Sequence, residues 1–276
     1  MEHPAEAPTA PRTTIHSVSF FHEDFSFDDI QRETETLPLP DIANIGECSL
    51  DMFRDEWDSF FHCHSNGSFF KSRRYICTEF ASFIQAECSI LEIGCGYGCT
   101  LIPIVNTHPG ISYVATDFSR NALSILEKNI AARLPVEHPK DKIRTEVLDI
   151  VRGPLVANQL PSRAIAVFAL SAINPVHHES AVRNIYDSLE PGGFFLFRDY
   201  AIHDMTMYRH KMRFGNKLFQ RSDGTLAYYF DTDYADRLFS SAGFSKLELR
   251  YDCVKCSNKR SKVDMKRVFV HAVFVK

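Results

Sequence analysis

The stretch ILEIGCGYG, residues 90–98, is a short apolar run that meets three glycines at alternate positions, and a helical pattern follows it. Because glycine has no Cβ, Gly94, Gly96 and Gly98 allow the main chain to turn sharply at the end of a strand and a ligand to lie directly against it. The stretch therefore predicts a strand, a glycine-rich turn and a helix around a ligand site.

An acidic residue closes the next strand pattern along the chain, Asp117 in VATD at residues 114–117. The carboxyl ends of neighbouring parallel strands share one edge of a sheet, so Asp117 is expected to face the ribose hydroxyls of a bound nucleoside. The spacing E-x-G-x-G-x-G differs from the G-x-G-x-x-G of dinucleotide sites, and no P-loop lysine follows it. A turn that only packs a helix on a strand would also use the glycines, but it would not need Asp117.

Strand and helix patterns alternate from residue 88 onward, which predicts an α/β fold with a doubly wound, mostly parallel sheet. The last two strands are joined by a basic loop without a helical pattern, so we expect them to pair antiparallel. Strands are expected at 88–93, 111–116, 143–148, 163–170, 194–199, 245–252 and 267–275, and helices at 98–107, 119–132, 177–189 and 233–241.

The regions before this alternation differ in composition. Residues 1–45 are rich in Pro, Thr, Glu and Asp and are expected to form a mobile tail, whose aromatic patch 20–27 would dock on the body or on a partner. Residues 46–87 carry aromatic side chains at helical spacing and predict a helical segment before the sheet. The α/β domain would then span 88–276, with an irregular insertion at 200–232.

Composition limits the class of protein. With 276 residues, of which 45% are hydrophobic, the chain can build a sizeable core. No apolar run reaches the roughly 18–20 residues that span a membrane, and the N-terminal residues lack a signal-peptide pattern. The eight cysteines are expected to be free thiols in a reducing compartment, which predicts a cytoplasmic location with the nucleus as the alternative. The pair Cys253 and Cys256 has no second pair beside it, so we expect no metal site; zinc is the alternative.

The net charge of −4 is unevenly distributed. Residues 1–197 hold 15 Lys and Arg against 26 Asp and Glu, whereas residues 198–276 hold 16 against 9. Such asymmetry favours a polyanionic partner for the basic part, and chance clustering on a solvated surface is the alternative.

Several phrases outside the glycine turn are more specific than the fold. They are Trp57-Asp58-x-Phe60-Phe61-x-x-His64, Phe69-Phe70-Lys71-x-Arg73, Leu170-Ser171-Ala172-Ile173-x-Pro175, Leu196-Phe197-Arg198-Asp199-Tyr200, Arg221-x-Asp223-Gly224-Thr225 and Arg267-Val268-Phe269. These phrases resemble the eukaryotic tRNA N3-cytidine methyltransferases, and the resemblance covers roughly residues 55–276. It implies that the helical segment 46–87 leads to the cofactor and RNA sites. The chain departs from the family pattern at Ser72, at the pair Arg74-Tyr75 and at Ala201, and these changes concern RNA contact more than cofactor binding.

The resemblance implies a seven-stranded, Rossmann-like class I methyltransferase that uses S-adenosyl-L-methionine. It also implies a tRNA substrate, with serine or threonine species the expected ones, and methylation of the cytidine at position thirty-two of the anticodon loop. An aminoacyl-tRNA synthetase such as seryl-tRNA synthetase is an expected partner, and a membrane is not. The alternatives are a class I methyltransferase acting on a small molecule or a protein, and a catalytically silent cofactor-binding subunit.

Cofactor roles follow from the strand ends. The three glycines would make room for the methionine part and Asp117 would bind the ribose. Asp149, after the third strand, would accept from the adenine amine unless it only caps a helix. By resemblance, two aromatic side chains of the upstream helix would fold over the cofactor, although plain core packing gives the same pattern. The remaining cofactor candidates are Ile150, Val167 and Leu170 along the cleft wall, and Trp57 and Phe61 above it.

N3 of neutral cytosine has an in-plane lone pair, so the reaction needs positioning more than a general base. The product base is cationic, and a nearby carboxylate would favour it. Asp199 is the candidate for that role unless an internal salt bridge to Arg198 or Arg209 holds it, and Arg198 would contact RNA or hold Asp199. The candidates for phosphate contact are Lys71, Arg73, Arg74, Arg209, Lys211, Arg213, Arg221, Lys259, Arg260 and Lys266.

Overall fold

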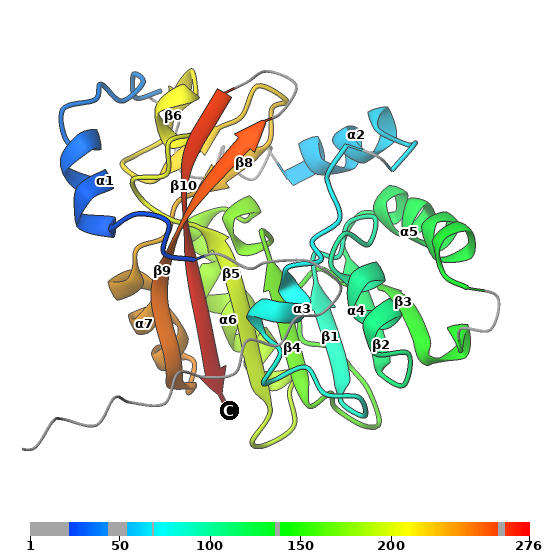
Figure 1. Cartoon of the computed structure of the whole chain (residues 1–276). Helices are drawn as coiled ribbons and strands as arrows, with labels where there is room; N and C mark the ends of the chain where they lie inside the picture. Colours follow the sequence, from blue (N-terminus) through cyan, green and yellow to red (C-terminus); the bar gives the residue numbers. More distant parts are fainter. Residues whose placement is uncertain (1–21, 44–53, 68, 136–138, 259–262) are drawn as a thin grey trace, which may run out of the picture.

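The computed structural model describes residues 22–43, 54–67, 69–135, 139–258 and 263–276. Its centre is a seven-stranded sheet with the order β3-β2-β1-β4-β5-β10-β9 (Figure 1). All neighbours from β3 to β5 pair in parallel, whereas β10 runs antiparallel to both β5 and β9. This confirms the predicted doubly wound, mostly parallel sheet. The strands are β1 (Ser89–Ile93), β2 (Ser112–Asp117), β3 (Ile143–Val147), β4 (Arg163–Val167), β5 (Phe194–Tyr200), β9 (Ser245–Asn258) and β10 (Val263–Val275).

Helices cover both faces of the sheet, because successive strand residues point to opposite sides. Ile90 of β1 packs in a core with residues of α3, α4 and α5, and Leu91 packs on the other face with residues of α6 and α7. Ser119 caps α5 as expected, since its Oγ accepts a hydrogen bond from the Ala122 N–H at 3.1 Å. These helices are α3 (Ile76–Glu79), α4 (Leu101–Thr107), α5 (Arg120–Arg133), α6 (His178–Asp187) and α7 (Thr232–Ser241).

The β9–β10 hairpin is longer than the strands predicted at 245–252 and 267–275. The N-terminal segment covers the edge of β9: the Asp24 N–H donates to the Cys253 carbonyl at 2.8 Å, and the Cys253 N–H donates to the His22 carbonyl at 2.7 Å. An edge strand with a partner can extend further than an open one. The sequence pattern does not show this contact, because the two segments are far apart in the chain, and the strands are therefore longer than predicted.

The insertion at 200–232, predicted to be irregular, contains a second antiparallel sheet of three short strands. Phe219 and Tyr229 are buried in a small core of its own. Its β7–β8 turn reaches the helix α2 (Asp55–Cys63), because a Cβ added at Gly224 would lie 2.9 Å from a carboxylate oxygen of Glu56. The strands of this insertion are β6 (Met212–Arg213), β7 (Leu218–Gln220) and β8 (Leu226–Tyr228).

Residues 22–43, which the sequence assigned to a mobile tail, contain the helix α1 (Phe27–Thr34) packed on the hairpin (Figure 1). Ile30 is wholly buried, and the Phe27 ring stacks on Tyr251 with the ring centroids 3.8 Å apart. The rest of the segment 1–45 lies outside the described residues. None of the described helices is long and apolar enough to cross a membrane. Short 3-10 helices lie at Lys140–Lys142, Leu170–Ala172, Pro175–His177 and Met207–Arg209.

Candidate active site

A cleft of about 460 Å³ opens at the carboxyl ends of β1, β2 and β4. This is the edge at which doubly wound sheets bind ligands, and the volume suits a nucleoside-sized molecule. The helix α2 contributes to one wall and the insertion contributes Leu226. The cleft therefore lies between the sheet edge and the two segments added to it.

The predicted glycine turn follows β1, but its three glycines have different structural roles. Gly94 lines the cleft with φ at 65°, and a Cβ there would lie 2.9 Å from the Ala169 Cβ. At Gly98, with φ at 91°, a Cβ would lie 2.6 Å from Leu126 of α5. Gly94 thus keeps the cleft open, whereas Gly98 serves the packing of a helix, which was the alternative explanation of the motif. Gly96 is not among the described residues that line the cleft.

Asp117 ends β2 and lines the same cleft. Its Oδ2 accepts a hydrogen bond from the Gly96 N–H at 2.9 Å, and its Oδ1 accepts one from the Ser119 N–H at 2.9 Å. Burial raises the pKa of this carboxyl to about 6, despite the two N–H donors. A carboxylate oxygen accepts more than one hydrogen bond, so Asp117 is oriented for hydroxyl donors in the cleft.

Asp149 and Ile150 also line the cleft, at the end of β3. Asp149 Oδ1 accepts from the Val151 N–H at 3.2 Å within a turn, so it does not cap a helix. Its Oδ2 lies 2.8 Å from Arg54 Nη2 and 3.2 Å from Arg152 Nε. Asp149 is therefore in place for a polar ligand group, but two arginines already contact it.

Val167 and Leu170, predicted as cleft wall, belong to the two hydrophobic cores and are not among the described lining residues. The reason lies between them: Phe168 adopts a positive φ of 56°, which turns the chain out of β4 earlier than the predicted end at residue 170. A non-glycine residue in this conformation is uncommon and often marks a ligand site. The wall is made instead by Phe168, Ala169, Ala172 and Ile173.

Trp57 and Phe61 of α2 also line the cleft, and Phe61 lies against the glycine turn, since a Cβ added at Gly96 would lie 3.4 Å from its ring. Phe61 is almost fully buried and packs edge-on against Phe60, with ring centroids 5.5 Å apart. The indole N–H of Trp57 is buried and has no hydrogen-bond partner among the described residues. A buried donor without a protein partner is costly and commonly marks a place for a ligand or water. The pair thus combines core packing with a place on the cleft wall.

Asp199 on β5 is fully buried and is not among the described residues that line the cleft. Its Oδ2 accepts from the Ser171 N–H at 2.9 Å, and its Oδ1 accepts from the Tyr200 N–H at 2.8 Å. Burial raises the pKa of Asp199 to about 6. The carboxylate therefore holds the backbone behind the cleft, and the charge of Arg221 lowers its pKa against the larger effect of burial.

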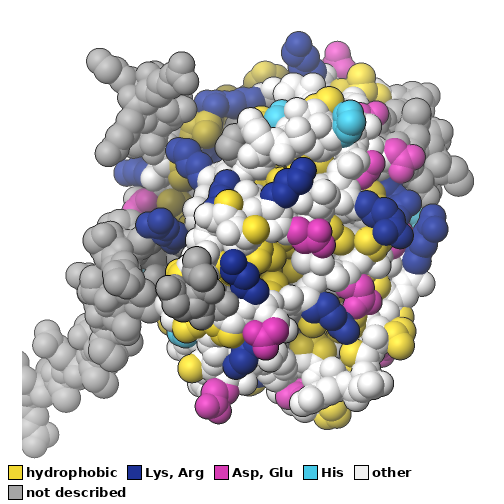
Figure 2. Space-filling view, turned by 90° about the vertical axis from the view of Figure 1, so that its right-hand side faces the viewer, with side chains coloured by type: hydrophobic (Ala, Val, Ile, Leu, Met, Phe, Trp, Pro, Cys, Tyr) yellow, Lys and Arg dark blue, Asp and Glu magenta, His cyan; other side chains and the backbone are white. Residues whose placement is uncertain are grey.

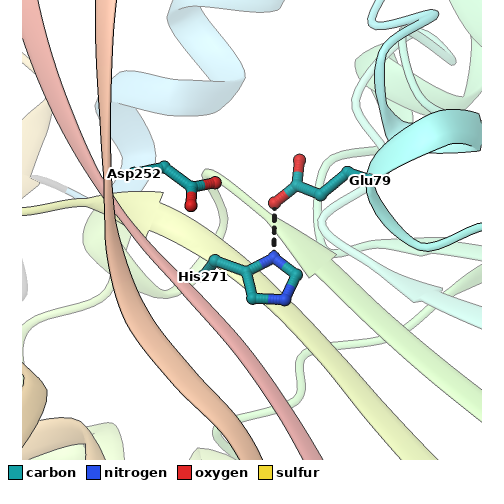
Figure 3. A group of neighbouring side chains, drawn as sticks. All are labelled: Glu79, Asp252 and His271. Atoms are coloured by element: carbon teal, nitrogen blue, oxygen red, sulfur yellow. Dashed lines mark hydrogen bonds and ion pairs between the residues drawn. The ribbon is translucent and has the colours of Figure 1, made fainter. Parts of the chain in front are cut away.

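Arg198 points to the other face of β5, which corrects its prediction as an RNA contact or a partner of Asp199. Its Nη1 lies 2.6 Å from Glu79 and 2.5 Å from Asp252. Figure 3 shows Glu79, Asp252 and His271 converging from α3, β9 and β10, with the His271 Nδ1 2.7 Å from Glu79. Burial raises the pKa of Glu79, but Arg198 and His271 outweigh it and the net shift is downward.

One oxygen of each of these carboxylates and a ring nitrogen of His271 lie within 4.8 Å of one another, close enough to bind one metal ion together. Here the guanidinium of Arg198 supplies the positive charge between the carboxylates. The group is therefore an ion-pair network that joins α3 to the hairpin.

The candidate RNA contacts differ in their surroundings. Arg73 donates to the Val167 carbonyl at 3.0 Å, Arg213 to the Pro40 carbonyl at 2.6 Å, and Lys266 pairs with Glu33, so these three stabilise the fold. Lys259 and Arg260 lie outside the described residues. The exposed members of the set are Lys71, Arg74, Arg209 and Lys211.

Arg221 is half-buried beside the cleft, with its guanidinium 5.5 Å from the Trp57 ring and 5.3 Å from the Tyr200 ring. Arg267 continues the series, 5.7 Å from Tyr200 and 5.0 Å from Phe269. Alternating arginines and aromatic rings suit the stacking of unpaired bases. The sequence selected Arg221 but not Arg267, although both stand in phrases that resemble the family.

The side of the molecule on which α5 lies has a different character. Figure 2 shows Lys and Arg side chains there interspersed with Asp and Glu. A mixed surface gives no single-sign field to attract a polyanion. The exposed basic residues outside α5 thus remain the candidates for RNA.

The chain matches the family model described as a methyltransferase domain over residues 66–249. It is 30% identical to the tRNA N(3)-cytidine methyltransferase METTL6 of Homo sapiens, over 80% of this chain and 79% of that protein. It is 31% identical to the tRNA N(3)-methylcytidine methyltransferase Mettl2 of Drosophila melanogaster, over 80% of this chain and 70% of that one. O-methyltransferase 3 of Dictyostelium discoideum is 31% identical over 68% of this chain and 44% of its own length.

Among solved structures, the fold is similar to 1,6-didemethyltoxoflavin-N1-methyltransferase of Burkholderia thailandensis, with a TM-score of 0.60 and 13% identity. That likeness covers 87% of this chain and 94% of the other, and it concerns the fold alone. Together with the sheet order and the glycine turn, these similarities place the chain in the class I methyltransferases, where it belongs to the family of the tRNA N(3)-cytidine methyltransferases.

Proposed function

We propose that this chain transfers the methyl group of S-adenosyl-L-methionine to N3 of an unpaired cytidine in tRNA. The observation that carries the proposal is the pairing of Asp117 with the Gly96 N–H beside a cleft that α2 also lines. The names of the relatives that match four fifths of the chain support the choice of substrate.

The residues present fit this cofactor. Asp117 is oriented for ribose hydroxyls, Asp149 is an acceptor for an amine, and the Trp57 N–H is a buried donor without a described partner. Gly94 leaves bare main chain where a Cβ would collide with Ala169. When bound, the cofactor supplies an electrophilic methyl group, and the protein has to place the nucleophile in line with it.

Cytosine N3 needs no proton removed, so no general base is assigned. Asp199 lies just behind the cleft wall and at neutral pH is mostly ionised, because its pKa is about 6. We propose that its negative charge favours the cationic product through the polarised Ser171 and Tyr200 backbone, without touching the base. Arg221 and Tyr200 are the proposed stacking groups for the base, which must leave its own stack to expose N3.

Finer points stand as proposals from the family resemblance. They are position thirty-two of the anticodon loop as the target, serine or threonine tRNAs as substrates, and seryl-tRNA synthetase as a partner. A cytoplasmic location, with the nucleus as the alternative, stays a prediction.

The test is nucleoside mass spectrometry of purified tRNA after incubation with the protein and labelled S-adenosyl-L-methionine, with and without seryl-tRNA synthetase. We expect label in 3-methylcytidine that disappears when the tRNA is first digested with ribonuclease. Label in a protein or small-molecule pool that survives digestion would support the alternative substrates instead. Binding of cofactor and RNA without transfer, with the synthetase present, would support a catalytically silent subunit.

A further inference from the structure

The adenine end of the cleft is already occupied by a side chain of the protein. Two groups there suit a purine: the ring of Phe118, which follows Asp117, and the carboxylate of Asp149. An aromatic ring stacks on a flat base, and a carboxylate accepts from its amine. This inference rests on the proposed function, because it concerns the adenosine half of that cofactor.

Arg54 contacts both groups at once. Its Nη2 lies 2.8 Å from Asp149 Oδ2, and its Cζ lies 4.7 Å from the centroid of the Phe118 ring. All three residues line the same cleft. The Asp149 carboxylate is 18% exposed and also accepts from the Val151 N–H and Arg152, which leaves it little room for another donor.

The chemistry of a guanidinium explains why it fits this place. It is planar, it stacks on aromatic faces and it presents N–H donors at its edge. An adenine ring offers the same combination, a flat face and an amine that donates from the edge. Both cannot cover the same face of Phe118 while donating to the same oxygen of Asp149.

We propose that Arg54 is a placeholder for the adenine ring, which the cofactor displaces from Phe118 and Asp149 when it binds. Arg54 is the residue at the N-cap position of α2, the helix that carries Trp57 and Phe61 over the cleft. Displacement of its side chain therefore acts on the first turn of that helix. The helix has an independent attachment, since Asp58 accepts from Ser119 Oγ at 2.5 Å and from Asn121 Nδ2 at 3.0 Å.

The consequence is that Arg54 weakens cofactor binding in the native protein. Removing it should tighten binding about three- to tenfold, the size expected from one partly exposed ion pair and one cation–π contact. The wild-type affinity should also rise with salt, since screening weakens the ion pair that the ligand has to break.

The experiment is calorimetric titration of S-adenosylhomocysteine, and separately of methylthioadenosine, into the full chain and its variants. Arg54→Ala is expected to bind both ligands more tightly by the same factor, because the gain lies in the adenine half that they share. Arg54→Lys keeps the charge without the planar face and should gain less. Arg120→Ala, which removes an exposed arginine at the start of α5, is the matched control and should bind as wild type does.

The single tryptophan of the chain gives a second readout. Trp57 lies on the same helix, so its fluorescence is expected to change on ligand binding in the wild type and to change at lower ligand concentration in Arg54→Ala. Unchanged or weaker binding of Arg54→Ala, with wild type binding normally, would overturn the placeholder. If Arg54→Ala fails to fold, Arg54→Lys decides: tighter binding than wild type would support the placeholder, and unchanged or weaker binding would overturn it. Absence of binding by folded wild type would instead refute the proposed function.

Discussion

The backbone N–H of Gly96 donates to the side chain of Asp117 over 2.9 Å, so the glycine turn after β1 and the acid that ends β2 fix each other. The bond joins the two motifs that the sequence singled out separately. It also means that the ribose acceptor and the turn beneath it form one structural unit.

Asp117→Ala is expected to weaken the binding of S-adenosylhomocysteine by about 100-fold, because it removes a charged acceptor and frees the Gly96 turn. Calorimetric titration measures this, and circular dichroism checks the fold. Asp187→Ala, which removes an exposed carboxylate at the end of α6, is the control. Unchanged affinity in folded Asp117→Ala would remove Asp117 from the cofactor site.

Asp199 makes folding stability depend on pH. Burial raises its pKa to about 6, above the value of about 4 in an unfolded chain. A carboxyl with a raised pKa stabilises the folded state below the lower value, and this contribution is lost as pH rises through the higher one. Between pH 4 and 7, the free energy of unfolding of wild type should fall by about 1–3 kcal/mol relative to Asp199→Asn.

Urea unfolding at several pH values measures this difference. The pKa of Asp117 is also raised, to about 6. Asp117→Asn should therefore reduce the fall in the free energy of unfolding over a similar pH range. Glu79→Gln is the contrasting variant, because the pKa of Glu79 is lowered. Parallel curves for wild type and Asp199→Asn would show that Asp199 titrates alike in both states.

Arg198→Met is expected to destabilise the fold by about 3–5 kcal/mol, because it leaves Glu79 and Asp252 buried without their cation. Arg250→Met is the matched control: Arg250 also pairs with Asp252 but is one third exposed, so its loss should cost about 1 kcal/mol or less. Urea unfolding compares the two. If Arg198→Met is stable and the slope of log tRNA affinity against log salt is reduced, Arg198 contacts RNA after all.

Lys71→Ala combined with Arg74→Ala should weaken tRNA binding and lower the slope of log affinity against log salt by about 1–2, one unit at most for each phosphate contact. Both side chains are exposed next to Arg73, whose own bonds are internal. Filter binding over a salt series measures the slope. The control removes Lys128 and Arg120, two exposed residues of α5. An equal loss of tRNA affinity in the control would show that Lys71 and Arg74 form no specific RNA surface.

The elements that the sequence predicted correctly depend on neighbours in the chain. The glycine turn, the Ser119 cap and the strand ending at Asp117 are local patterns, and the mostly parallel sheet follows from the alternation of strands and helices. The errors at Val167, Leu170 and Arg198 have a different origin. The positive φ of Phe168 decides where β4 ends, and the face of β5 on which Arg198 lies is matched by Glu79 and Asp252, which are distant in sequence. Arg54 was missed because only the fold brings it to Asp149.

Trp57→Phe should separate ligand contact from core packing. The substitution keeps an aromatic ring but removes the buried indole N–H that has no partner among the described residues. Removing an unsatisfied donor gains about 1–3 kcal/mol, which offsets much of the packing lost with the smaller ring, so the ligand-free protein should change little in stability. Affinity for S-adenosylhomocysteine should nevertheless fall about five- to tenfold, the value of one hydrogen bond to the ligand. Phe61→Leu is the contrasting variant, expected to lower stability by about 1–2 kcal/mol through lost packing. If Trp57→Phe loses stability and keeps its affinity, the Trp57 side chain serves the core alone.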